Sequence, residues 1–289
     1  MDVTSRDNDR LFVLDGASLK LLNNVGVGRL PFGVAVNTTT NKVYVANWGS
    51  SDITVLDATT RAFLQRIDVG PSPTFVEINS KTNRIYTVKY GSNGLMVING
   101  DTHAIEYSVG TGGVGAWGLA VNPNLNRVYV SNRDSGTVTT LDGNNNYEVI
   151  YSHTIKPCGE TGSAPYGLGF NPGNNKLYIA CSPFHNVTSA AVYAAGSSGL
   201  SRLAFFPIGE GGDTGGGAAA VDTATGNVFF TNSYANTVSV VSGATNQVIA
   251  TVTAGESPYG AAADPTTRRL YIGNQISRSV TIIQDTFTP

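Results

Sequence analysis

The sequence predicts an all-β fold, a single β-propeller of four-stranded antiparallel blades, from two observations. A strand–turn–strand motif, NKVYVANWGSSDITVLDATT at residues 41–60 in its first full copy, recurs along the chain. Each copy is also preceded by one strand-like stretch and followed by another. A four-stranded unit repeated every ~40 to 50 residues is the pattern of propeller blades. The aromatic residue of the hairpin marks the units at Tyr44, Tyr86, Tyr129, Tyr178, Phe229 and Tyr271.

The first complete unit shows why each element is expected. Residues 33–37, 43–46, 53–56 and 64–70 have the two-residue period and the β-branched or aromatic content of strands. The Gly-Ser-Ser-Asp stretch at 49–52 is a turn by composition. A single sheet of this kind cannot bury both of its faces, so neighbouring units must pack around a common axis. The recurring Asp15, Asp57 and Asp142 after the third strand are expected to form turns.

The pattern is compatible with six or seven blades, and seven is slightly favoured over six. Complete units start near residues 30, 72, 116, 164 and 214, and a unit from 257 has only three strands. Residues 1–28 supply the last three strands of another unit. Only six inner strands are present, which favours six blades. The alignment of residues 2–15 with a complete hairpin favours seven, with incomplete end blades in one domain spanning 1–289.

Composition narrows the functional classes. Charged residues make up 13% of the chain and the net charge is −2, so there is no broad basic face for nucleic acid. No apolar run approaches the ~20 residues that span a bilayer, and any secretory leader would lie upstream of this chain. Cys158 and Cys181 are the only cysteines, and both should reach one rim of the ring. A disulfide, which would imply an oxidising compartment, and two separate buried thiols are both compatible with their positions.

The repeated texts NKVYVAN, NRVYVSN, NKLYIAC and RRLYIGN, followed by ITVLDATT or VSVVSGAT, resemble the YVTN-repeat β-propeller family of bacterial and archaeal surface and secreted proteins. The resemblance covers almost the whole chain. It implies an extracellular, cell-surface or periplasmic location. Because family members include surface-layer modules, periplasmic binding proteins and lyase-like or lactonase-like propellers, the resemblance does not choose a function.

Aromatic residues gather on the face where the inner strands begin. The position before the inner-strand Gly is aromatic in four units, and the loops after the second strands add further rings and one Arg. Either the rings wedge between blades, or they form a collar that stacks on a planar or sugar ligand, with the Arg anchoring a carboxylate. These candidate ligand-binding residues are Phe32, Trp48, Tyr90, Trp117, Arg133, Tyr166, Tyr234 and Tyr259.

Glu77 and Lys89 depart from the repeat within one unit. Glu77 lies in an inner strand where the other units have Ala or Gly, and Lys89 replaces a recurring Asn that is expected to hold a turn through backbone hydrogen bonds. A carboxylate in such a place must be paired, hydrated or functional. The structural interpretation is a salt bridge between Glu77 and Lys89. The catalytic interpretation makes Glu77 a general base, with Lys89 stabilising an oxyanion and His185 beside them.

The sequence therefore predicts a secreted or surface-associated binding or scaffold propeller that recognises a protein, peptide or glycan, or a small molecule, through its channel face. Three scattered His residues give no metal-ligand spacing, so neither a metal nor another cofactor is expected. The alternative is a lyase- or hydrolase-type enzyme acting at the channel mouth. Self-assembly is a third prediction, because the incomplete end blades could accept strands from a neighbour.

Overall fold

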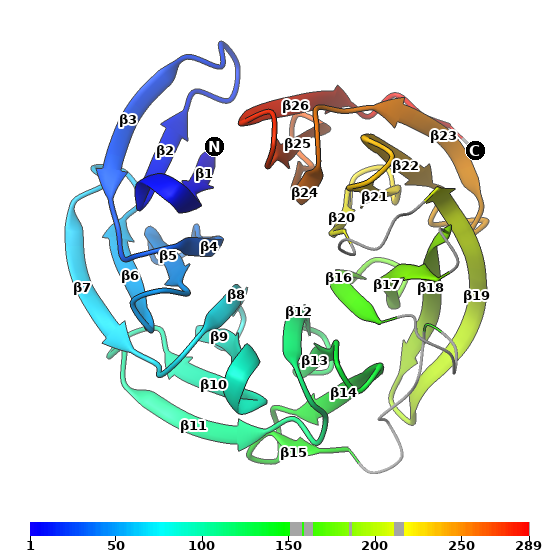
Figure 1. The fold of residues 1–289 in the computed structure, drawn as a ribbon. Coiled ribbons are helices and arrows are strands. Elements are labelled where there is room, and N and C mark those ends of the chain that lie inside the picture. The colour runs from blue at the N-terminus through cyan, green and yellow to red at the C-terminus, as the bar shows by residue number, and fades with distance from the viewer. Residues whose placement is uncertain (151–157, 159–163, 185–186, 211–216, 289) are drawn as a thin grey trace.

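Seven antiparallel sheets are arranged as blades around a central axis in the computed structural model, which describes residues 1–150, 158, 164–184, 187–210 and 217–288 (Figure 1). The chain is thus a seven-bladed β-propeller, as predicted, with the expected incomplete blade at each end. Two 3-10 turns, η1 (Arg6–Asn8) and η2 (Tyr90–Ser92), are the helices of the described ranges. None of these ranges contains a helix with the length and apolar character to cross a membrane.

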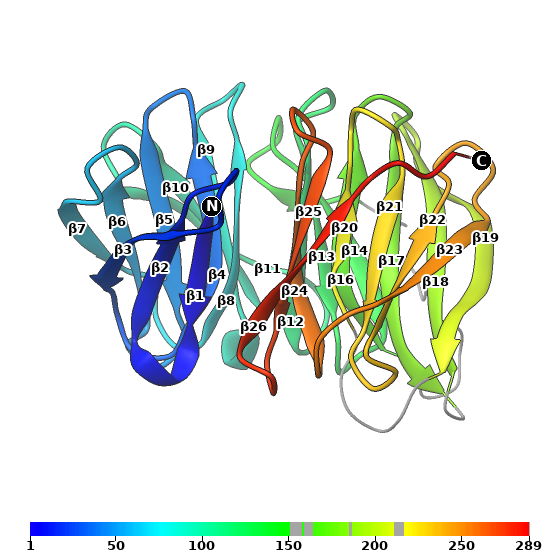
Figure 2. The same ribbon diagram turned by 90° about the horizontal axis from the view of Figure 1, so that it is seen from above.

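Each complete blade runs from an inner strand at the axis to an outer strand at the rim (Figure 1), and Figure 2 shows the ring edge-on. Blade 1 consists of β1 (Asp2–Ser5), β2 (Arg10–Leu14) and β3 (Leu21–Gly26). Blade 2 consists of β4 (Pro31–Asn37), β5 (Lys42–Asn47), β6 (Asp52–Asp57) and β7 (Phe63–Asp68). Blade 3 consists of β8 (Pro73–Asn79), β9 (Arg84–Lys89), β10 (Gly94–Asn99) and β11 (Ile105–Gly110). Blade 4 consists of β12 (Ala116–Asn122), β13 (Arg127–Asn132), β14 (Thr137–Asp142) and β15 (Glu148–Val149).

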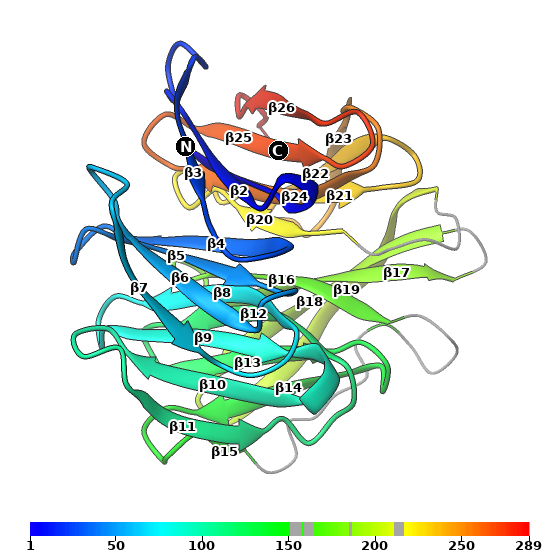
Figure 3. The same cartoon turned by 60° about the vertical axis from the view of Figure 1, so that its left-hand side comes forward.

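The remaining blades complete the ring and bring blade 7 beside blade 1 (Figures 1 and 3). Blade 5 consists of β16 (Pro165–Asn171), β17 (Lys176–Phe184), β18 (Val187–Gly196) and β19 (Gly199–Glu210). Blade 6 consists of β20 (Ala219–Val221), β21 (Val228–Asn232), β22 (Thr237–Val241) and β23 (Val248–Thr253). Blade 7 consists of β24 (Pro258–Asp264), β25 (Arg269–Asn274) and β26 (Ser279–Gln284).

The hydrophobic core lies between blades. The recurring aromatic residue of one blade packs into the next: Tyr44 contacts the cluster of Ile85 in blade 3, and Phe229 contacts that of Leu270 in blade 7. Burying one large apolar side chain contributes roughly 1.5–3 kcal/mol. The repeated ring therefore acts as a repeated inter-blade anchor. Its fully buried members are Tyr44, Tyr86, Tyr129, Tyr178 and Phe229.

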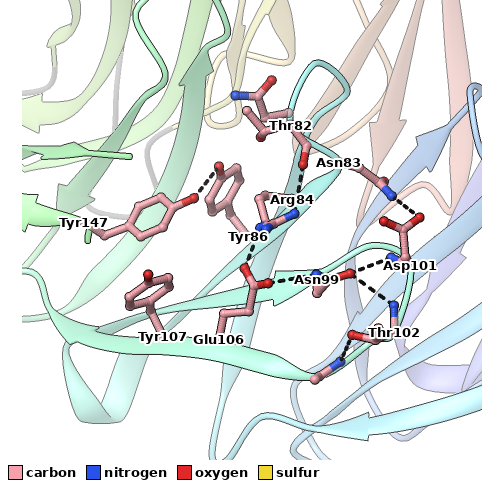
Figure 4. Close-up of polar contacts among 12 residues, drawn as sticks. Thr82, Asn83, Arg84, Tyr86, Asn99, Asp101, Thr102, Glu106, Tyr107 and Tyr147 are labelled. Atoms are coloured by element: carbon pink, nitrogen blue, oxygen red, sulfur yellow. Dashed lines mark hydrogen bonds and ion pairs between the residues drawn. The ribbon is translucent and has the colours of Figure 1, made fainter. Parts of the chain in front are cut away.

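Where the outer parts of blades 3 and 4 meet, polar groups bond to the hydroxyl of one recurring ring, Tyr86 (Figure 4). The hydroxyl groups of Tyr86 and Tyr147 lie 3.1 Å apart, and burial raises the pKa of both side chains. Nearby, Arg84 forms an ion pair with Glu106, which also accepts a 2.8 Å hydrogen bond from Asn99. Both phenols therefore remain neutral hydrogen-bonding groups at physiological pH.

The turns confirm the role expected of the recurring Asp residues. Asp57 Oδ1 accepts hydrogen bonds from the backbone N–H groups of Thr59 (2.9 Å) and Thr60 (2.7 Å). Asp15 Oδ1 does the same for the backbone N–H groups of Ala17 and Ser18, and hydrogen bonding lowers the pKa of both carboxyls. These side chains are occupied in holding their own turns.

The recurring Asn at the end of the second strand acts differently from the prediction. Asn132 Nδ2 donates to the hydroxyls of Thr137 (3.1 Å) and Thr139 (2.8 Å) on the next strand. Asn47, Asn232 and Asn274 also donate to side-chain oxygens of the third strand. The prediction of a turn held mainly by backbone bonds was wrong, because the buried amide donates to side chains of the third strand instead.

Candidate functional site

Aromatic rings from five blades meet at the mouth of the channel, on the face where the inner strands begin. Trp117 lies 5.4 Å from Tyr90, 5.6 Å from Phe32, 5.8 Å from Tyr166 and 5.9 Å from Trp48, measured between ring centroids. The rings thus contact one another across the mouth instead of only wedging between adjacent blades. We call this group the aromatic collar; its members are Phe32, Trp48, Phe75, Tyr90, Trp117, Tyr166 and Tyr259.

Irregularities at the start of the inner strands place these rings. The pairing register shifts between Ala116 and Leu119 and again between Pro165 and Leu168, with equivalent shifts in blades 2, 3 and 7. A β-bulge re-aims the side chains within it. The bulge therefore takes the intervening rings out of the regular ladder and turns them toward the axis.

In the bulges of blades 2, 4 and 5 a glycine follows the ring, because the backbone of the next blade passes close by. A Cβ added to Gly118 would lie 2.3 Å from the carbonyl oxygen of Tyr166. The hydroxyl of Ser131 donates to the same carbonyl at 2.6 Å and also accepts from the Gly118 N–H at 2.7 Å. Gly118 and Ser131 of blade 4 thus hold the backbone that carries Tyr166.

Arg133 lies among the collar rings. Its guanidinium carbon is 4.8 Å from the ring centroid of Tyr90, 5.2 Å from that of Trp117 and 5.8 Å from that of Tyr166. Its Nε contacts Asp134 at 2.8 Å and its Nη2 donates to the Tyr90 hydroxyl at 2.5 Å. Within the described residues its Nη1 has no hydrogen bond, so one donor group of a positioned cation remains for a ligand.

Tyr90 completes this polar unit. Its hydroxyl donates to Asp134 Oδ2 at 3.0 Å, and burial together with that hydrogen bond raises its pKa. A second cation, Arg6 on η1, lies 6.0 Å from the ring centroid of Phe32. Cation–π contacts of this kind contribute from about 0.5 to 2 kcal/mol. The mouth therefore combines apolar ring surfaces with two guanidinium groups.

Tyr234 is on the same face but outside the collar. Its side chain is 63% exposed, and the loop that carries it is held by a 2.6 Å hydrogen bond from the Ser233 hydroxyl to the Pro258 carbonyl. Phe75, Arg6 and Asp134 belong to the site although sequence reasoning did not name them. Arg6 could have been predicted from the repeat, because residues 2–7 align with residues 129–134 and this alignment places Arg6 at the position of Arg133. For Phe75 the sequence offered only its position next to Thr74, the residue of that unit at the ring position.

The three predicted catalytic residues are not brought together. Glu77 pairs with Tyr86 in the β8–β9 ladder, whereas Lys89 pairs with Pro73. Lys89 is three positions beyond Tyr86, so its side chain points to the opposite face of the sheet. The expected ion pair is absent among the described residues, and His185 lies outside them. Burial raises the pKa of Glu77 to about 7.

Cys158 and Cys181 form a disulfide in the structure, with Cα atoms 5.5 Å apart and both residues buried. Cys181 stands where other blades have the structural Asn, and it pairs in the ladder with Pro165. The disulfide thus lies beside the strand position that precedes Tyr166. It ties the connection that enters blade 5 to the strand that supports one collar ring.

A concavity lies on the opposite face, between blades 5 and 6. Its lining is mostly backbone and small polar side chains, with Lys176 as its cation. Lys176 Nζ is already bonded to the Gly243 carbonyl (2.6 Å) and to Asn246 (2.9 Å). The described residues also contain no group of three or more His, Cys, Asp or Glu suited to a metal. The collar is therefore the better candidate site.

Comparison with solved structures agrees with the fold. A structure of Kuenenia stuttgartiensis hydrazine synthase aligns over 99% of this chain and 92% of that chain, with 16% identity and a TM-score of 0.85. A functionally unknown protein from Desulfotomaculum acetoxidans DSM 771 aligns over 99% and 92%, with 15% identity and a TM-score of 0.82. The β-propeller domain of Myceliophteria thermophila Cps50 (Swd1) aligns over 99% and 96%, with 10% identity and a TM-score of 0.73.

At these identities the likeness defines the class, a β-propeller, and nothing finer. No family model and no curated protein matches the sequence. Membership in the YVTN-repeat family therefore stays a prediction from the repeated sequence motifs.

Proposed function

We propose that this protein is a binding module of the YVTN-repeat type that holds its ligand on the aromatic collar. The observation that carries the proposal is the contact among rings from five blades, three of which also lie against the guanidinium of Arg133. Phe32, Trp48, Tyr90 and Tyr166 each keep part of their surface exposed. Rings that are already fixed by one another lose little conformational entropy on binding, which favours recognition.

The ligand class follows from the chemistry of the mouth. Flat apolar rings suit the faces of sugars or the side chains of a peptide, and Arg133 Nη1 suits a carboxylate. Asp134 already balances part of the Arg133 charge, so a ligand held by charge alone would gain little. We therefore expect a carboxylate attached to a ring-bearing or apolar body, in a glycan or peptide.

Intrinsic fluorescence tests this proposal, because the two tryptophans of the chain, Trp48 and Trp117, are both collar residues. Titration with an oligouronate and with a peptide carrying acidic and aromatic residues should change the tryptophan emission to saturation for at least one of them. Arg133→Ala should weaken that binding about 10- to 100-fold, the loss expected for a charge-assisted hydrogen bond. Arg202→Ala, an exposed Arg on the outer strand β19, is the matched control and should bind like the parent. Unchanged emission with both probes, or full affinity in Arg133→Ala, would refute the proposal.

We also propose that the protein works in an extracellular, cell-surface or periplasmic location. The disulfide between Cys158 and Cys181 supports this, because disulfides persist in oxidising compartments. Immunodetection of the protein in periplasmic or culture fractions of its host tests the location. Recovery in the cytosolic fraction with free thiols would contradict it.

A catalytic function is the second candidate, and Glu77 is the observation that favours it. A carboxyl whose pKa burial raises to about 7 is suited to general acid–base work near neutral pH. Neither Lys89 nor any other cation is paired with it among the described residues. A screen of lactone and uronate substrates with the parent and Glu77→Gln tests this function: turnover that the substitution abolishes would support it, and turnover that survives would remove Glu77 from the mechanism.

A further inference from the structure

The Arg-Asp dipeptide of the collar occurs twice in the repeat, and the two copies differ in their contacts. Arg133 and Asp134 follow the second strand of blade 4, and Arg6 and Asp7 have the same place in blade 1, three blades away around the ring (Figure 1). In blade 4 the two side chains form an ion pair, with Arg133 Nε 2.8 Å from Asp134 Oδ1. In blade 1, Asp7 instead lies 4.0 Å from Arg278 of blade 7. Arg6 is therefore not paired with its neighbouring carboxylate.

No other described carboxylate balances the charge of Arg6. Within the part of the chain that the structure describes, Arg6 forms no hydrogen bond and no ion pair, and its guanidinium carbon lies 6.0 Å from the ring centroid of Phe32. Asp9, which follows η1, accepts a 2.8 Å hydrogen bond from the backbone N–H of Leu30. A guanidinium group is always charged and can only donate hydrogen bonds. Arg6 thus offers an unpaired cation at the edge of the collar.

Tyr259 lies within electrostatic reach of both cations. Its ring centroid is 5.9 Å from that of Phe32. Burial raises the pKa of its hydroxyl, whereas a hydrogen bond from Trp117 and the charges of Arg133 and Arg6 act to lower that pKa. Because the indole N–H can only donate, the Tyr259 oxygen is the acceptor of this bond. The O–H of Tyr259 has no acceptor among the described residues, so it is a further donor at the mouth.

The polar groups around the collar therefore form a set of donors. Arg6, the Nη1 of Arg133 and the hydroxyl of Tyr259 all retain donors without an acceptor in the described ranges. Asp134 is the carboxylate of this set, and it is already bonded to Arg133 and to the Tyr90 hydroxyl. A ligand must supply the remaining acceptors. One carboxylate at Arg133 would leave Arg6 unmatched.

We propose that the ligand of the collar is a dicarboxylate, whose two carboxylates bind Arg133 and Arg6 and whose ring-bearing body crosses the collar between them. This inference rests on the proposed binding function and adds to it a second anionic group and Arg6 as a binding residue. The surface between the cations suits such a body, because Phe32 and Trp117 are in edge contact, with centroids 5.6 Å apart. Binding of one carboxylate also raises the effective concentration of the other at its partner.

Matched pairs of probes test the second charge. One pair is a disaccharide of two uronic acids and the same disaccharide with one acid replaced by a neutral sugar. The other is the end-blocked peptide Glu-Phe-Glu and its analogue Glu-Phe-Gln. Binding is followed by the emission of Trp48 and Trp117. In at least one pair the dicarboxylate should bind at least about tenfold more tightly than the monocarboxylate, the gain expected from one charge-assisted hydrogen bond. The pair that shows this gain identifies the body as a sugar or a peptide.

Arg6→Ala tests the second contact. It should weaken binding of the dicarboxylate about tenfold and change that of the monocarboxylate less than about twofold, whereas Arg133→Ala should weaken both. Arg10→Ala removes another exposed Arg of blade 1, one that bonds to Asn24, and is the matched control with unchanged affinities. Equal affinities within both probe pairs, or a preference that persists in Arg6→Ala, would overturn this inference and leave the collar as a binding site. No binding of any probe would refute both proposals.

Discussion

Replacing Glu77 by Gln should make the protein more stable at alkaline pH and leave its stability unchanged in acid. Burial raises the pKa of Glu77 from 4.5 to about 7, so the folded protein binds this proton more tightly than the unfolded chain does. Such a group contributes its full stability below pH 4.5 and loses it as the pH rises through 7. The two pKa values correspond to about 3 kcal/mol, and partial access to the channel reduces the realised effect to about 1–3 kcal/mol.

Urea unfolding at pH 4, 6 and 8 measures this effect. The free energy of unfolding of Glu77→Gln should exceed that of the parent at pH 8 by about 1–3 kcal/mol and match it at pH 4. Glu256→Gln, which alters an exposed carboxyl, is the control and should follow the parent at every pH. A loss of stability at pH 8 in Glu77→Gln would refute the reasoning, because it would mean that the ionised carboxylate has a favourable partner.

Three further perturbations test the packing that supports the site. Gly118→Ala should lower the free energy of unfolding by about 1–3 kcal/mol because its Cβ meets the next blade, whereas Gly260→Ala, whose Cβ meets nothing within 4 Å, should change it by less than about 0.5 kcal/mol; equal effects in urea would contradict this difference in packing. Asn132→Ala should cost about 2–4 kcal/mol in thermal unfolding, because two threonine hydroxyls lose their buried donor, and a neutral result would show that water replaces the amide. Cys181→Ala should cost about 2–4 kcal/mol, and a reductant should lower the melting temperature of the parent but not of this variant.

The sequence favoured seven blades, and it did so through one alignment within the repeat. The hairpin of residues 2–14 aligned with complete hairpins, and β1 and β2 pair in the register that this alignment requires. Six inner strands were also visible in the sequence, and their number favoured six blades. What decides for seven blades is that residues 1–28 form their own sheet beside blade 2 and do not complete blade 7.

The arrangement of the candidate site could be predicted only in part. The sequence placed the rings and Arg133 on one face, but it could not show that the bulges aim the rings at one another across the channel. The proposed Glu77–Lys89 pair failed because adjacent strands do not guarantee a shared face. Their register places Tyr86, and not Lys89, opposite Glu77, and a three-residue step reverses the side-chain direction.

The most direct test of the collar as a binding site is a crystal structure of the protein soaked with a mixed set of oligouronates, acidic peptides and aromatic carboxylates. The account predicts ordered ligand density against the ring of Trp117, with a carboxylate within hydrogen-bond distance of Arg133 Nη1. A collar without ligand, or a ligand bound only away from Trp117 and Arg133, would contradict it.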